Sequence, residues 1–194
     1  MKTAHKPTYS FLVLMIGLII INTLLARFAV VALPFGGVPG VSSLYIAIAF
    51  MILFTLWFGG YGAIAAYVGC FIGSGVLGGI PAHVNWYWSL SGLWQVLIPL
   101  VAFRMLNGDL TLGKRRDILV FVIFGVVVNN AFGALWGTVT LAIGNMIAWA
   151  EVTPAFFAWF IGNIVVTAVI VPLALRYGTP HIRKTKVFVR NYWD

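Results

Sequence analysis

Residues 117–143 read DILVFVIFGVVVNNAFGALWGTVTLAI, and this stretch decides the fold class of the chain. It contains no charged residue after Asp117, and its polar side chains are those of asparagine and threonine, with one tryptophan. An α-helix needs roughly 20 predominantly apolar residues to span the hydrocarbon core of a bilayer, and this stretch is longer than that. It therefore predicts a transmembrane helix.

Similar apolar runs lie on both sides of this stretch and predict an all-α bundle of about six transmembrane helices. Glycine-rich turn signals separate several runs, such as Gly59-Gly60-Tyr61-Gly62. The second and third runs are short, so a tilted or partly buried hairpin is an alternative there. No polar block is long enough to fold separately, which predicts a single transmembrane domain over residues 1–194. The predicted spans cover residues 10–32, 43–58, 62–77, 86–103, 117–143 and 154–176.

The composition excludes an ordinary soluble domain. Hydrophobic residues make up 62% of the chain and charged residues 8%, with a mean hydropathy of +1.03. A soluble domain usually carries roughly 25% charged residues, which it needs to cover its surface. This chain has too few charges to cover itself in water, so we expect it to be a multi-pass protein of the cell membrane.

The positive charges predict the orientation of the bundle. They fall before the first span, between the fourth and fifth, and after the sixth, and six crossings place these three regions on one side. The predicted loops on the other side, at about 33–43, 78–86 and 144–153, contain no Lys or Arg. Lys and Arg are retained on the cytoplasmic side, so both termini are expected inside. The basic residues concerned are Lys2, Lys6, Arg104, Lys114, Arg115, Arg116, Arg176, Arg183, Lys184, Lys186 and Arg190.

The net charge of +8 is explained by this topology and by attraction to anionic lipids, without nucleic acid as a partner. The basic tail at 177–194 fits that interpretation. Aromatic residues such as Phe188 and Trp193 alternate there with basic ones, as in an interfacial anchor. Docking of the tail on a cytoplasmic partner is the alternative.

Arg27 is the most informative ionisable residue, because charged groups inside a membrane are costly. It falls in the outer half of the first span, and the nearest acidic candidate is Glu151 in the last outer loop. One interpretation is that Arg27 faces an outward-opening cavity and binds an acceptor on a ligand, with Glu151 nearby. The others are snorkelling to the outer interface and a structural pair with Glu151.

Neutral amides form a second group of candidates. Gln95, Asn145 and Asn163 fall in the same outer half as the arginine, whereas Asn129 and Asn130 lie in the fifth span. Amide side chains donate and accept hydrogen bonds, so they suit the orientation of a small polar ligand. They also bond transmembrane helices to one another, which is the competing interpretation.

The outer segment PAHVNWYW at 81–88 adds His83 and Trp86 to the candidate ligand-binding residues. Its tryptophans, with Trp94, Trp136, Trp149 and Trp159, are typical of an aromatic belt at a membrane interface. A stacking wall over a ring-shaped ligand is the functional alternative. A single histidine is too little for a metal site.

Small residues at four-residue spacing predict close helix packing. Gly69 and Gly73 recur in the third span, and Gly133 and Gly137 recur in the fifth. Such rows let helix backbones approach closely in lipid. We expect them to pack within one molecule, and a dimer or sliding surface is the alternative.

Catalytic chemistry has no sign in this sequence. The chain has four acidic residues and one cysteine, Cys70, so no carboxylate pair, metal-ligand cluster or disulfide is predicted. No phosphate-binding glycine loop is recognisable either. We therefore expect neither an enzyme nor a bound cofactor, and a proton- or sodium-coupled carrier would normally need intramembrane carboxylates.

The order of these features resembles the substrate-binding S components of energy-coupling factor transporters. The first helix ends in ALPFGGVPG at 32–40, and a short second helix leads into FGGYGA at 58–63. The segment from Gly162-Asn163 to PLAL at 172–175 looks like the last helix of that group. The resemblance covers most of the chain.

This resemblance implies a membrane-embedded subunit that binds a vitamin-like small molecule near the outer surface. A separate coupling membrane protein and a pair of ATPases would then supply the energy for uptake. The family's ligand sites involve the first loop and the later helices, where Arg27, Asn145 and Glu151 fall here. The alternative function is a small structural or sensory subunit of a larger membrane complex.

Overall fold

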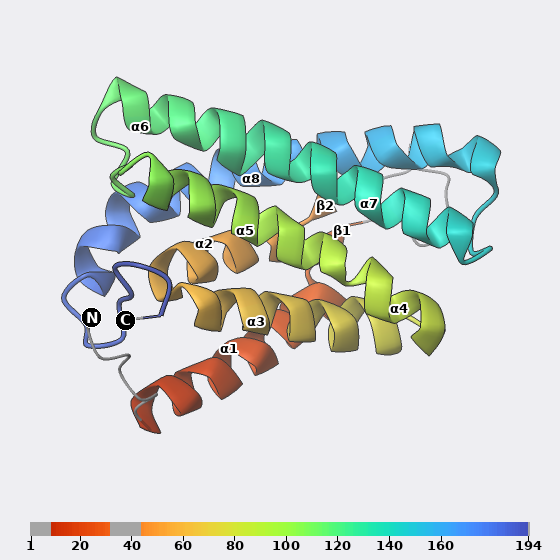
Figure 1. The fold of residues 1–194 in the computed structure, drawn as a ribbon, viewed down its shortest axis with the longest axis horizontal. Coiled ribbons are helices and arrows are strands. Elements are labelled where there is room, and N and C mark those ends of the chain that lie inside the picture. Colours follow the sequence, from red (N-terminus) through yellow and green to blue (C-terminus); the bar gives the residue numbers. More distant parts are fainter. Residues whose placement is uncertain (1–8, 32–43, 194) are drawn as a thin grey trace.

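The computed structural model describes residues 9–31 and 44–193, and most of them are helical. The expected helical class is confirmed (Figure 1). Besides turns and loops, the described ranges contain a short antiparallel strand pair, in which β1 (Val30–Val31) pairs with β2 (Leu44–Tyr45). The helices are α1 (Tyr9–Phe28), α2 (Ala47–Phe58), α3 (Gly60–Cys70), α4 (Ala82–Trp88), α5 (Leu90–Met105), α6 (Arg115–Val120), α7 (Asn129–Ile143) and α8 (Val152–Ile182).

Three shorter helical segments extend this set. The π-helix η1 (Phe71–Val76) continues α3, the π-helix η2 (Phe121–Val128) joins α6 to α7, and the 3₁₀ turn η3 (Trp149–Glu151) leads into α8. Four continuous helices are long and apolar enough to cross a membrane by length and composition. Two further apolar helices, Ala47–Phe58 and Gly60–Val76, are shorter. The four long helices are Tyr9–Phe28, Ala82–Met105, Arg115–Ile143 and Trp149–Ile182.

The short helix α2 lies at the centre of the bundle. It contacts α1, α3, α5 and α8, and ten of its residues are buried. It begins at Ala47 rather than near residue 43, because Leu44–Tyr45 pair with β1 instead. An apolar helix buried on all sides is a core element. The prediction of a short or partly buried second helix therefore matches its position.

Glycines bring α1 close to α3 and η1. A side chain at Gly69 would collide with Asn22, and one at Gly73 would collide with the Thr23 carbonyl. In α7, Gly133 lies against Gln95 in the same way. These predicted small-residue rows therefore pack within one molecule. The opposite face of α1 is exposed and apolar; its exposed residues include Leu12, Val13, Ile16, Ile20 and Leu24.

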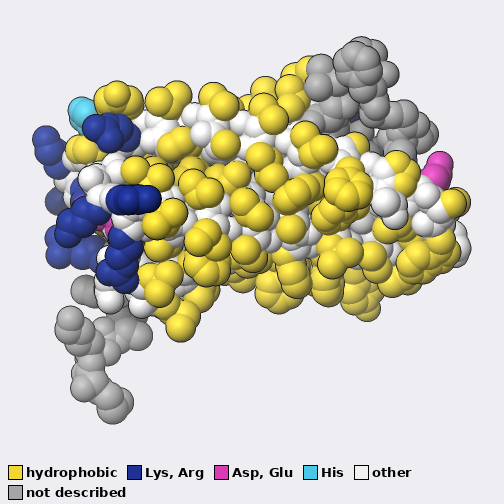
Figure 2. All heavy atoms as spheres, turned by 90° about the horizontal axis from the view of Figure 1, so that it is seen from above, with side chains coloured by type: hydrophobic (Ala, Val, Ile, Leu, Met, Phe, Trp, Pro, Cys, Tyr) yellow, Lys and Arg dark blue, Asp and Glu magenta, His cyan; other side chains and the backbone are white. Residues whose placement is uncertain are grey.

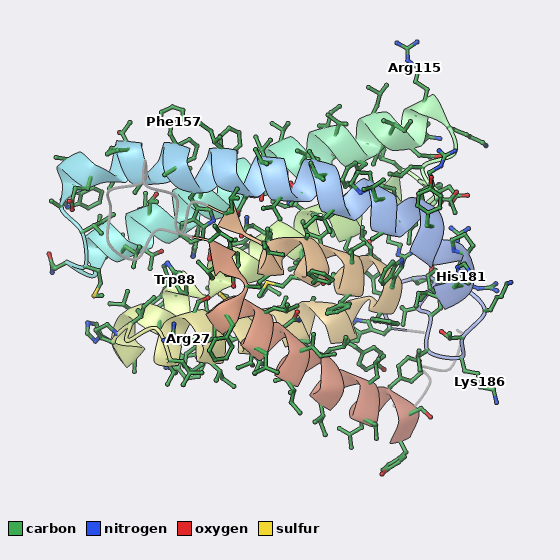
Figure 3. All side chains as sticks on the ribbon, turned by 180° about the vertical axis from the view of Figure 1, so that it is seen from behind. Arg27, Trp88, Arg115, Phe157, His181 and Lys186 are labelled. Atoms are coloured by element: carbon green, nitrogen blue, oxygen red, sulfur yellow. The ribbon has the colours of Figure 1, made fainter. Side chains whose placement is uncertain are left out.

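Apart from Arg27, the described Lys and Arg residues gather at one end of the molecule, and an acidic side chain lies at the other end (Figures 2 and 3). The basic end holds the end of α5, the start of α6 and the end of α8. Figure 3 shows Arg115, His181 and Lys186 there. The flank between the two ends is covered mainly by hydrophobic side chains in Figure 2.

The C-terminal tail folds back on this basic end. The helix α8 continues to Ile182, so the tail begins later than the predicted residue 177. The Val189 N–H donates to the Trp57 carbonyl at 2.9 Å, and the Gly60 N–H donates to the Tyr192 carbonyl at 2.7 Å. Val189 is completely buried. The tail therefore caps the turn between α2 and α3, a contact that neither interpretation of its sequence included.

Candidate small-molecule site

A cavity of about 290 Å³ lies in the half of the bundle that is away from the basic end. Small-molecule sites typically occupy roughly 300–1,000 Å³, so the cavity is near the lower limit. Figure 3 shows two of its lining residues, Arg27 and Trp88, in the same region of the molecule. The described lining residues are Ala26, Arg27, Val30, Tyr45, Cys70, Gly73, Ser74, Gly78, Ile80, Trp88, Ser91, Gly92, Gln95 and Trp159.

The π-helix η1 forms one wall of the cavity. Its Ser74 hydroxyl donates to the Ala26 carbonyl at 2.9 Å and lies 3.1 Å from the Tyr45 hydroxyl. Ser74 therefore ties the end of α1 to the β-strand pair. π-Helical turns interrupt α-helices frequently at functional sites, and this one faces the cavity through Gly73 and Ser74.

Two tryptophans line the cavity from different helices. The rings of Trp88 and Trp159 are 5.9 Å apart and inclined at 53°. Gly137 on α7 leaves room for the Trp159 ring. Trp88 is 6% exposed, and neither indole N–H has a hydrogen-bond partner among the described residues. Both indole nitrogens are shielded from solvent. Because an unpaired buried donor is costly, a ligand acceptor that reached either N–H group would remove this cost.

Gln95 connects the cavity to a buried hydrogen-bond network. Its Nε2 donates to Asn130 Oδ1 at 2.9 Å, and Asn130 Nδ2 donates to Thr167 Oγ1 at 3.0 Å. The Thr167 hydroxyl in turn donates to the Asn163 carbonyl at 2.7 Å. The network joins α5, α7 and α8 beside the cavity. These amides therefore bond the helices together, and only Gln95 among them also lines the cavity.

Arg27 lies at the edge of the cavity with an exposed side chain. Its guanidinium carbon is 5.9 Å from the centre of the Phe28 ring. Glu151 instead accepts a hydrogen bond from the Ala148 N–H at 2.8 Å and so caps η3. Within residues 9–31 and 44–193, the ion pair found joins Arg183 to Asp109, and none involves Arg27. The structural pair with Glu151 is therefore absent from the structure.

The other predicted site residues lie outside the cavity. Asn145 is exposed in the turn after α7, with a φ of 55°. Trp86 is 57% exposed and packs on Phe71, and His83 lines a different hollow. Asn163 is buried in α8, and its side-chain Nδ2 has no partner among the described residues. The predicted loop at 33–43 lies outside the described residues.

Among the described lining residues, Arg27 and Gln95 were predicted to bind a ligand and the others were not; the missed ones include Trp88, Trp159, Tyr45 and Ser74. Trp88 and Trp159 were recognised only as members of the aromatic group, because spacing does not reveal which ring faces inward. Tyr45 and Ser74 had no sequence signal. Their proximity depends on the β-strand pair and the π-helix, and neither element was predicted.

A second and larger hollow, of about 650 Å³, lies between α4 and α7. Its lining includes His83 and Thr140 but is otherwise mainly apolar. The Thr140 hydroxyl already donates to the Trp136 carbonyl at 2.7 Å, and Trp136 Nε1 donates to the Tyr87 carbonyl at 2.7 Å. Specific sites combine apolar walls with converging free polar groups, and this hollow lacks them.

The described residues contain no group of three or more His, Cys, Asp or Glu side chains placed to hold a metal ion. Cys70 is a buried free thiol in the wall of the smaller cavity.

Comparison with known proteins found no matching family model, no matching curated protein and no matching solved structure. Function is therefore inferred from the geometry and chemistry of the chain itself.

Proposed function

We propose that this chain is a multi-pass protein of the cell membrane, with six helical crossings and both termini in the cytoplasm. The four long apolar helices and the basic end support this proposal. Lys and Arg mark the cytoplasmic side of membrane proteins, which places the cavity near the outer surface. The short α2 completes a crossing because protein surrounds it, so its polar ends do not need to meet lipid.

We further propose that the chain is the small-molecule-binding subunit of an ATP-driven uptake transporter. The observation that carries this proposal is the cavity with the unpartnered indole N–H of Trp88 in its wall. The described part of the lining contains no carboxylate that would support coupling to protons or sodium through this site. Separate ATPase subunits and a coupling membrane protein are the energy source that the resemblance to S components implies.

Two measurements on one preparation test this function. The tagged full chain is purified in mild detergent from its native membrane, and mass spectrometry identifies both the co-purifying proteins and the small molecules released by denaturation. We expect a stoichiometric small molecule together with ATPase and coupling subunits. Recovery of a different membrane complex without a small molecule would favour the structural or sensory alternative.

A matched pair of variants assigns any bound molecule to the cavity. Trp88→Ala removes part of the cavity wall and should abolish retention of the small molecule. Trp94→Ala is the control, because Trp94 packs on Phe132 and Trp136 away from the cavity. Equal retention by both variants would show that the molecule binds elsewhere.

A further inference from the structure

We infer that the cavity selects a planar organic anion, such as an aromatic carboxylate. The inference rests on the proposed binding function and adds the chemical class of the ligand. In this assignment, Arg27 and the indole N–H groups of Trp88 and Trp159 bind the acceptor atoms of the ligand, and the two indole rings contact its flat body.

Charge is the first argument. Among the described residues that line the cavity, Arg27 is the one with a charged side chain, and none is Asp or Glu. No carboxylate of the described residues forms an ion pair with its guanidinium. A bound cation would therefore meet uncompensated positive charge, whereas a carboxylate would form a charge-assisted and potentially bidentate hydrogen bond with Arg27.

The balance of donors and acceptors is the second argument. Indole nitrogen donates but does not accept hydrogen bonds, and both lining indoles are unpaired. The Ser74 hydroxyl hydrogen is already used on the Ala26 carbonyl, and one of the two Gln95 Nε2 hydrogens is used on Asn130 Oδ1. The free hydrogen-bonding capacity of the site is therefore weighted toward donors. A ligand rich in acceptor oxygens, such as a carboxylate, complements it.

Shape is the third argument. Trp88 comes from α4 and Trp159 from α8, so the two rings approach the cavity from separate elements. The two rings are inclined to each other at 53°, with their centroids 5.9 Å apart. Aromatic rings prefer such offset or edge-to-face neighbours. A flat ring therefore satisfies the walls better than a puckered or branched body of the same volume.

The test uses the full chain in nanodiscs of zwitterionic lipid and isothermal titration calorimetry. The probes are benzoate, 2-naphthoate and indole-3-carboxylate, each compared with its uncharged carboxamide. We expect at least one carboxylate to bind roughly tenfold or more tightly than its carboxamide, the difference that a charged hydrogen bond produces. Cyclohexanecarboxylate, a puckered anion, should bind more weakly than benzoate. Equal binding within every pair, or no saturable binding by any carboxylate, overturns the inference.

Variants assign the preference to named side chains. Arg27→Gln should remove most of the advantage of the carboxylate while leaving binding of the carboxamide unchanged. Arg115→Gln, at the opposite end of the molecule, is its control (Figure 3). Trp88→Phe keeps a ring but removes the N–H, and should weaken the carboxylate more than Trp94→Phe does. Elution volume and melting temperature identify variants that fail to fold. An unchanged carboxylate advantage in folded Arg27→Gln overturns the assignment.

Failure of this inference is distinguishable from failure of the proposed function. A neutral compound that co-purifies with the native chain and is lost in Trp88→Ala would overturn the anion assignment but support the binding function. If no compound co-purifies and no probe binds, both fail.

Discussion

Asn130 lies at the point where three helices meet, and its amide shows how the bundle is held together. Its Nδ2 donates to the Val126 carbonyl at 2.8 Å and to Thr167 Oγ1 at 3.0 Å, while its Oδ1 accepts from Gln95. Asn130 and Thr167 are completely buried. Apolar burial distinguishes poorly between protein and lipid surroundings, so such interhelical hydrogen bonds add specificity to the packing.

Thr167→Val tests the value of the bond between α7 and α8. The substitution preserves the shape of the side chain but leaves Asn130 Nδ2 with one partner fewer. We expect a loss of about 0.5–1.5 kcal/mol in the free energy of unfolding, as for other interhelical bonds in membranes. Thr138→Val is the control, because Thr138 is equally buried and its hydroxyl bonds only to carbonyls of its own helix. Reversible unfolding in mixed micelles measures the free energy of unfolding of both variants. Equal losses in Thr167→Val and Thr138→Val would contradict the proposed role of the bond.

Asp109 provides a pH-dependent contact between the α5–α6 connection and the end of α8. Burial alone would raise the pKa of Asp109. Hydrogen bonds from the Thr111 N–H and hydroxyl, and the Arg183 guanidinium 2.8 Å away, outweigh burial and lower the pKa below its ordinary value of 3.8. The stabilisation is therefore fully present above the ordinary pKa and is lost as the pH falls through the lower folded value.

Protonation of Asp109 at low pH should weaken its contact with Arg183 and so increase hydrogen exchange at the start of the tail. Hydrogen exchange at residues 183–186 is measured as the pH falls from 6 to 3, after correction for the intrinsic exchange rate. Because both side chains are more than a third exposed, we expect at most a roughly fivefold rise in corrected exchange. Asp109→Asn should show the faster exchange at every pH. An unchanged pH profile in Asp109→Asn would show that another group controls the effect.

The residue scale also shows how much of the site the sequence contained. Arg27 and Gln95 were predicted from the cost of polar groups in an apolar segment, and both line the cavity. Asn145 and Asn163 met the same criterion but do not line it. Position in a predicted span estimates depth in the membrane, whereas the direction of a side chain depends on the rotation of its helix. Tertiary packing sets that rotation.

At the scale of elements, the close contact between α1 and α3 depends on a glycine, which has no side chain to hold the two helices apart. Gly69→Ala would place a methyl group against the backbone and Cβ of Asn22. We expect a loss of about 1–3 kcal/mol, typical of overpacking, because the obstructing atoms belong largely to a helix backbone. Gly17→Ala on α1 is the control, since no atom lies within 4 Å of its new Cβ. Alanine favours helix there, so this variant should be neutral or slightly more stable. Equal melting temperatures for both variants would contradict this packing.

The helices that could be predicted from the sequence are those whose length is set by the thickness of the membrane. Long apolar runs give α1, α5, α7 and α8, because membrane thickness and helix rise demand about 20 residues. The π-helices and the β-strand pair were not predicted. The π-helix η1 differs from α-helix by a small shift of hydrogen bonds, and the strands are two residues each. Such elements leave no periodic pattern in a sequence.

At the scale of the whole molecule, the two ends differ in chemistry. One end carries most of the described basic residues and the docked tail, and the other carries the cavity with Arg27 and an acidic side chain (Figures 2 and 3). The apolar flank between them accounts for the high mean hydropathy, since it leaves many large hydrophobic side chains exposed. In the proposed membrane location, a bilayer would remove these side chains from water, and the positive-inside rule would orient the basic end toward the cytoplasm.

Cysteine labelling tests this orientation directly. In a Cys70→Ala background, Ala148→Cys places a thiol at an exposed position of the cavity end, and Lys184→Cys places one at an exposed position of the basic end. We expect a membrane-impermeant maleimide to label Ala148→Cys in intact cells and Lys184→Cys only after permeabilisation. The positive-inside rule is the physical reason, because moving the basic end outward would transfer many cations across the membrane. The reverse pattern would place the cavity in the cytoplasm and exclude uptake from outside. Labelling of both thiols in intact cells would contradict the proposal that the two ends lie on opposite sides of the membrane.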